Sequence, residues 1–162
     1  MSMAVLLPEK FADFAQEWRH IPAGERRWVG QLTGALPSVL LTWLAEHQDG
    51  LILMVARDPA QVSVFEEELQ FLGVQPQVFP DWETLPYDRL SPHQDIISER
   101  LALLSNMPTR GVVLVAASTL MQRVAPPSWL LGQHFDLHKG QQFQVERERQ
   151  RLTRAGYRAV ET

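Results

Sequence analysis

Residues 111–117, GVVLVAA, form a near-continuous apolar run, and they decide the fold. Strands of this kind are typical of parallel sheets that helices cover on both faces. Residues 51–56, LILMVA, fit the same description, while residues 75–80, QPQVFP, predict a shorter edge-like or parallel strand. Residues 28–32 predict one more short strand after a turn-like segment. The sequence therefore contains the strands of a mainly parallel sheet.

Helical patterns separate these strands. Asp58 and Pro59 form an N-cap and first-turn pair for a helix that Gly73 ends. Apolar residues along that helix recur at helical spacing, and residues 7–19, 33–48 and 118–124 predict further helices. Strands that alternate with helices imply right-handed βαβ units. The predicted fold class is α/β, with a doubly wound parallel sheet.

The helix that precedes residues 111–117 has a capping-box signature. Ser91 and Gln94 have the required spacing, and Pro92 suits the first helical position. We expect this helix to end near Met107. Its predicted apolar stripe consists of Ile96, Ile97, Leu101 and Leu104.

Charge and composition divide the chain near Gly132. The formal net charge is -4 over 162 residues. Residues 1–132 carry 9 Lys/Arg and 15 Asp/Glu, a net of -6, and residues 133–162 carry 6 and 4, a net of +2. We expect an α/β domain over 1–132, and over 133–162 the start of a small α+β second domain, with a helix from about Val145 to Ala155.

Several classes of protein are disfavoured by composition. The absence of cysteine excludes disulfides and thiolate metal sites, and it favours a reducing cytoplasm. No apolar run approaches the roughly 20 residues of a membrane-spanning helix. No signal peptide is evident. We therefore expect a cytoplasmic protein without a membrane partner.

A nucleotide site would be expected at the first strand-to-helix turn of such a sheet, where the sequence is GQLTGALPSVLL. A P-loop, G-x-x-x-x-G-K-[ST], needs glycines that let backbone N–H groups wrap phosphates, a lysine, and a hydroxyl for magnesium. Anchored on Thr33 and Gly34, the second glycine falls on Leu36, the lysine on Pro37 and the hydroxyl on Ser38. Pro37 supplies neither a cation nor an N–H. We predict a structural turn without a bound cofactor.

The acids of residues 79–101 raise the alternative of a metal or acid/base site. Asp95 and Glu99 share a helix face, but His93 is two residues from Asp95 and points elsewhere. Acids in a first helical turn are favoured by the helix dipole alone, so capping is preferred over metal binding. Asp81 and Glu83 are interpreted as polar loop residues.

Nucleic-acid contact is the other alternative. Trp82 and Tyr87 have only Arg89 as a nearby cation, so we interpret both aromatics as packing residues rather than stacking platforms. Four arginines near the C-terminus recur at helical spacing and are weak candidates for a phosphate or an acidic partner, although a solvated face is preferred. No nucleophile elbow or Cys/His pair is present, so no catalytic residue is assigned. These four arginines are Arg147, Arg151, Arg154 and Arg158.

Residues 81–101, DWETLPYDRLSPHQDIISERL, and 111–130, GVVLVAASTLMQRVAPPSWL, resemble the N-terminal region of bacterial transcription-repair coupling factors, the Mfd family. The order of elements agrees from about Glu25 onward. Residues 25–35, ERRWVGQLTGA, resemble the family's opening strand and turn, and the segment from Lys139 to Glu161 resembles the start of its second domain.

The resemblance implies a non-catalytic, UvrB-like module that lacks a working P-loop and the DNA-probing hairpin of UvrB. It implies that the longer protein displaces stalled RNA polymerase by ATP-driven translocation on DNA and recruits UvrA in nucleotide excision repair. ATP and magnesium would then belong to later motor domains. The implied partners are other domains of the same polypeptide, UvrA through a complete second domain, and RNA polymerase and DNA through later domains. A residual nucleotide- or metal-dependent hydrolase and a direct DNA-binding domain remain alternatives.

Overall fold

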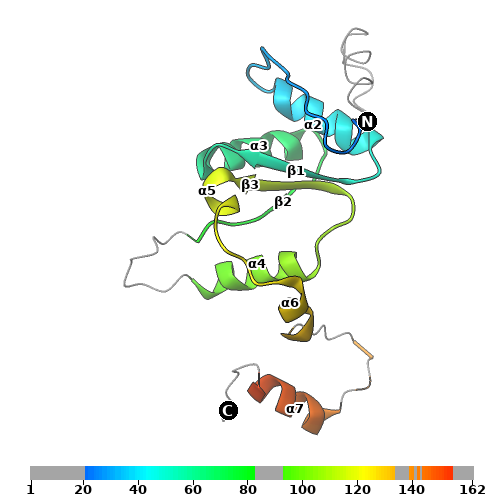
Figure 1. Cartoon of the computed structure of the whole chain (residues 1–162), viewed down its shortest axis with the longest axis vertical. Coiled ribbons are helices and arrows are strands. Elements are labelled where there is room, and N and C mark those ends of the chain that lie inside the picture. The colour runs from blue at the N-terminus through cyan, green and yellow to red at the C-terminus, as the bar shows by residue number, and fades with distance from the viewer. Residues whose placement is uncertain (1–20, 83–92, 134–138, 141, 143, 155–162) are drawn as a thin grey trace. The chain divides into compact units, whose positions relative to one another are not determined.

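The structure is a computed structural model that describes residues 21–82, 93–133, 139–140, 142 and 144–154. Its sheet contains β1 (Leu51–Ala56), β2 (Gln77–Val78) and β3 (Gly111–Ala116) in the order β1-β3-β2 (Figure 1). Both pairings are parallel. The three predicted strands at these positions are confirmed, although the second is only two residues long. The expected helix at residues 7–19 lies outside the described residues.

Helices cover the two faces of the central strand β3. The chain passes from β1 through α3 (Pro59–Phe71) to β2, and returns from β2 through α4 (Gln94–Ser105) to β3. Because the two crossovers run in opposite directions across the sheet, right-handed connections place their helices on opposite faces. Leu114 accordingly packs in a core with α2 and α3, whereas Val113 and Val115 pack with Leu103 of α4. The α/β fold, with a three-stranded parallel sheet and flanking helices, is confirmed.

The helix on the α3 face begins as its sequence predicts. Asp58 is the N-cap of α3, and its carboxylate accepts a hydrogen bond of 2.8 Å from the Gln61 N–H. Pro59 occupies the first turn, where a missing N–H costs nothing. Gly73 follows the helix at a φ of +88°, a conformation that favours glycine. α2 (Leu36–His47) packs beside α3 and buries Leu41 in the same core.

Two sequence predictions about secondary structure are wrong. Residues 28–32 do not form a strand, and Trp28 is 91% exposed. Edge strand β1 pairs only with β3 among the described residues, so residues 28–32 have no ladder partner there. α4 begins at Gln94 with His93 as its N-cap, not Ser91, because His93 is extended with a ψ of 138°.

The apolar stripe of α4 also differs from the prediction. Leu103 is buried and Leu104 packs beside it, whereas Leu101 is exposed. Ile96 and Ile97 are half-buried, and Arg100 is buried on the same side of the helix as Leu103 and Leu104. An arginine therefore occupies a place that helical spacing would assign to an apolar residue.

The chain divides into two compact units, residues 1–123 and 124–162. The first unit holds the sheet and also α5 (Ala117–Leu120), which follows β3 directly. The second holds α6 (Pro127–Gln133) and α7 (Val145–Arg154), and the latter confirms the helix expected there. The domain assignment of 1–132 and 133–162 stays a prediction. Within the described ranges, no helix has the length and apolar character needed to span a bilayer.

Candidate functional site

The turn before α2 stands where a P-loop would lie. Gly34 has a φ of +60°, and Pro37 lies in the first turn of α2. Ser38, at the position of the motif hydroxyl, is fully buried, and its Oγ donates a hydrogen bond to the Glu68 carboxylate of α3. That hydroxyl therefore joins two helices of the core instead of facing a site for magnesium.

The same turn contains a residue with an unusual backbone. Gln31 has a φ of +63° and is the non-glycine residue with a positive φ among the described residues. The spacing of the P-loop motif, counted back from Ser38, assigns its first glycine to this position. The backbone therefore has the left-handed conformation that suits a glycine, although the residue is a glutamine.

His93 and Asp95 lie together at the N-terminus of α4, contrary to the expectation that His93 points elsewhere. The His93 Nδ1 atom is 3.2 Å from Asp95 Oδ2 and lies 3.4 Å from the Asp95 backbone N. His93 can reach Asp95 because it is the N-cap and lies outside the helical cylinder. Both side chains are strongly exposed, and within the described ranges no group of three or more His, Asp or Glu residues is placed to hold a metal ion.

A polar cluster that the sequence analysis missed lies where the chain leaves β2. The Arg100 guanidinium lies over two aromatic rings, with its Cζ 4.3 Å from the Phe79 centroid and 4.1 Å from the Trp82 centroid. Arg100 is only 2% exposed, and its Nη1 donates a hydrogen bond of 2.5 Å to the Pro80 carbonyl. The packing role predicted for Trp82 is confirmed, whereas Tyr87 lies outside the described residues.

Asp81 links this cluster to α5. Its Oδ1 accepts hydrogen bonds from Gln122 Nε2 at 2.7 Å and from the Trp82 backbone N–H at 2.9 Å. Burial raises the pKa of Asp81, but the hydrogen bonds from Gln122 and Trp82, the Thr119 hydroxyl and the positive Arg100 together hold the pKa below its ordinary value. Asp81 is thus a half-buried structural anion rather than a free loop residue. We call these residues the Arg100 cluster: Phe79, Asp81, Trp82, Arg100, Thr119 and Gln122.

Three buried atoms of the Arg100 cluster lack a hydrogen-bond partner within the part of the chain that the structure describes. They are Arg100 Nη2, Thr119 Oγ1 and Gln122 Oε1. The Thr119 hydroxyl contributes to lowering the Asp81 pKa. Burial lowers the pKa of Arg100 and the Asp81 charge opposes that shift, yet an arginine stays protonated at neutral pH. A sequence signal for the cluster existed, because Arg100 interrupts the apolar spacing of α4.

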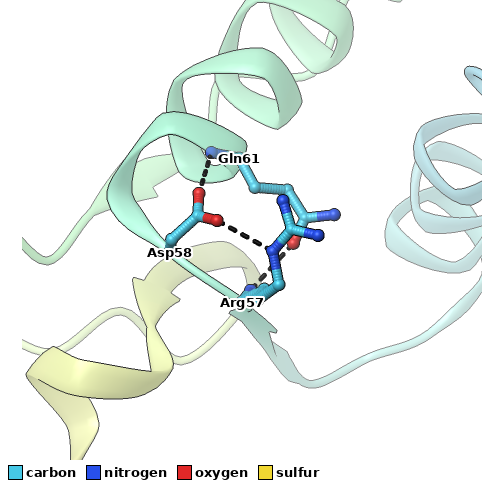
Figure 2. Close-up of polar contacts among 3 residues, drawn as sticks. All are labelled: Arg57, Asp58 and Gln61. Atoms are coloured by element: carbon cyan, nitrogen blue, oxygen red, sulfur yellow. Dashed lines mark hydrogen bonds and ion pairs between the residues drawn. The ribbon is translucent and has the colours of Figure 1, made fainter.

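A second polar group lies at the carboxyl end of β1 (Figure 2). Arg57 Nε contacts Asp58 Oδ2 at 2.8 Å, and the Arg57 backbone N–H donates to Gln61 Oε1 at 2.8 Å. The hydrogen bond from Arg57 is the largest cause that lowers the pKa of Asp58, followed by that from the Gln61 N–H. These contacts fix the start of α3, and the Arg57 side chain remains exposed.

The structure describes three of the four candidate arginines near the C-terminus. Arg147, Arg151 and Arg154 all belong to α7 and are exposed, whereas Arg158 lies outside the described residues. Arg151 pairs with Glu148 at 3.1 Å, and Arg149 lies 4.0 Å from Glu146.

The first unit is an α/β domain of the doubly wound class, in which ligands typically bind at the carboxyl ends of the strands. No protein-family model matches the chain. The chain is 44% identical over 144 residues to a transcription-repair-coupling factor of Escherichia coli and 36% identical over 140 residues to one of Haemophilus influenzae. These matches cover 87% and 85% of the chain but only 12% of each relative. A Mycobacterium tuberculosis transcription-repair-coupling factor is 31% identical over 54% of the chain and 8% of its own length.

The chain is therefore homologous, over most of its length, to transcription-repair-coupling factors. The resemblance that its motifs indicated is confirmed.

Proposed function

We propose that the chain is a non-catalytic interaction module of a transcription-repair coupling factor and acts in transcription-coupled nucleotide excision repair. The non-catalytic part of this proposal rests on the residues that occupy the P-loop position. Pro37 replaces the cation, and the Ser38 hydroxyl is buried against Glu68. A triphosphate at this turn would find neither a lysine nor a hydroxyl that is free to ligate magnesium.

The Arg100 cluster supports the same proposal. Ligands of doubly wound sheets bind beyond the carboxyl ends of the strands, and Asp81, Thr119 and Gln122 lie there. Gln122 donates a hydrogen bond to Asp81, Asp81 also accepts one from the Trp82 backbone N–H, and Arg100 donates one to the Pro80 carbonyl. We infer that this edge of the sheet is held by internal contacts and stabilises the fold of the module.

The partners follow from the family. We propose that the module packs against other domains of a longer polypeptide and presents a complete second domain to UvrA. Contacts with RNA polymerase, and the ATP-driven translocation on DNA that displaces it, are assigned to later domains. The small share of each relative that the chain matches, 12%, leaves room for such domains in those relatives.

Isothermal titration calorimetry with ATP and magnesium tests the non-catalytic assignment. We expect no binding by the chain. The comparison is the Leu36→Gly/Pro37→Lys double variant, which restores two motif residues but keeps Ser38 bonded to Glu68. Binding of ATP to the unaltered chain with micromolar affinity would overturn the proposal.

A capture experiment tests the interaction role. Immobilised chain and a version extended through the full second domain are each mixed with purified UvrA. We expect capture by the extended version and little by the chain alone. Failure of both to retain UvrA would contradict the proposed recruitment role without affecting the assignment as non-catalytic.

A further inference from the structure

One side of α7 carries three arginines without an intervening acid. Arg147, Arg151 and Arg154 are separated by four and three residues, so at 3.6 residues per turn they fall within about 60° of one another around the helix axis. Val145 and Leu152 lie on the opposite side, and Glu146 and Glu148 lie on the flanks by the same geometry. We call this side the arginine face of α7.

The helix dipole does not explain this arrangement. Acids in the first turn and cations in the last turn are favoured by the dipole, which accounts for Glu146, Glu148, Arg151 and Arg154. Arg147 is in the first turn, where a positive charge is unfavourable. Within the described residues Arg147 has no ion pair that would offset this cost, and Arg154 has none either. The position of Arg147 therefore calls for a reason outside the isolated helix.

The residue types on the arginine face of α7 indicate which class of partner it binds. Arginine also occurs at protein interfaces, but there it is accompanied by tryptophan and tyrosine anchors, and the arginine face contains neither. Single-stranded nucleic acid is bound with the help of stacked aromatic rings, which this face also lacks. A row of guanidinium groups about 10 Å long instead matches the regularly spaced phosphates of a duplex. Arginine binds phosphate oxygens through two parallel N–H bonds.

We propose that the arginine face of α7 binds the phosphodiester backbone of a nucleic-acid duplex, without reading its sequence. Arg151 would exchange its ion pair with Glu148 for a phosphate oxygen, and three phosphate contacts in all predict a log–log dependence of affinity on salt with a slope of about -2.7. The inference is independent of the proposed function, because neither UvrA binding nor the P-loop position enters it.

Fluorescence anisotropy of a labelled 20-base-pair duplex tests the inference with the whole chain. The test variant is Arg147→Gln/Arg154→Gln, because glutamine keeps helix propensity while it removes the charge. The matched control is Arg57→Gln/Arg110→Gln, which removes two exposed arginines of the first unit. We expect the test variant to reduce the magnitude of the slope by about 2 and the control to leave it unchanged. Circular dichroism verifies that α7 keeps its helical signal.

Two results would overturn the inference. One is absence of duplex binding by the unaltered chain at about 50 mM salt, where phosphate contacts are strong. The other is equal loss of binding in the test and control variants, which would indicate a general charge effect. As a further arm, labelled polyglutamate replaces the duplex, and tighter binding of polyglutamate would assign the face to an acidic protein and overturn the proposal.

Discussion

Replacement of Arg100 by methionine tests whether the Arg100 cluster stabilises the fold. The variant loses a charged hydrogen bond to the Pro80 carbonyl, which contributes about 1.5–3 kcal/mol, and cation–π contacts with two rings, each worth up to about 2 kcal/mol when desolvated. Relief of the buried charge and of the unpaired Nη2 opposes this loss by about 1–3 kcal/mol. We therefore expect the free energy of unfolding to fall by about 2–4 kcal/mol. Arg100→Lys should lose nearly as much, because an ammonium lacks the planar guanidinium that packs on aromatic rings.

Urea denaturation followed by circular dichroism measures these differences. The matched control is Arg110→Met, because Arg110 forms an exposed ion pair with Asp49 at 3.1 Å. Exposed pairs contribute about 0–1 kcal/mol, so the control should stay close to the unaltered chain. An Arg100→Met variant as stable as the unaltered chain would show that the cost of burying the charge cancels its contacts. That result would refute the reasoning.

Three further predictions concern acid stability, the P-loop position and the backbone. The pKa of Asp81 is lowered in the folded state, so its contribution is complete above an unfolded pKa of about 3.9 and is lost as the pH falls through the folded value. Acid titrations should therefore show a smaller loss of stability below about pH 5 for Asp81→Asn than for the unaltered chain, and equal slopes would contradict the assignment. Ser38→Ala should cost about 1–2 kcal/mol in urea denaturation, and Ser63→Ala, whose exposed hydroxyl bonds weakly, much less; similar costs would argue against the Glu68 contact. Gln31→Gly should be at least as stable in thermal melts, whereas a clear destabilisation would show that the left-handed φ is not strained.

The strands and the helix starting at Pro59 could be predicted because their signals are local. Residues 51–56 and 111–116 are apolar along their length, and an N-cap followed by proline is a property of neighbouring residues. The same local signal failed at residues 28–32, because a strand exists only where a second strand supplies its hydrogen bonds. It also failed at the start of α4, where the Ser91–Gln94 spacing fits a capping box but His93 is the cap.

The Arg100 cluster could not be predicted from local pattern because its members come from distant parts of the chain. Gln122 reaches Asp81 across 41 residues, and Arg100 reaches Pro80 across 20. They come together because α4 packs beside the end of β2, where Phe79 contacts Leu103, and because β3 lies next to β2 in the sheet. The sequence did offer one sign, a charged residue at a spacing that matches the buried face of α4.

The P-loop position and the Arg100 cluster have a common physical feature. At both places, polar groups that a doubly wound sheet could offer to a ligand bond instead to the chain itself: Ser38 to Glu68, and Asp81 to Gln122. A ligand that drew Ser38 or Asp81 away from its partner would break that hydrogen bond and leave the partner without it. The cost of leaving a buried polar group unpaired is about 1–3 kcal/mol. A ligand at either place would have to repay that cost before it gained affinity. The bonds of Ser38 and Asp81 thus disfavour a small-molecule site that would use these two side chains, and they support a role as an interaction module.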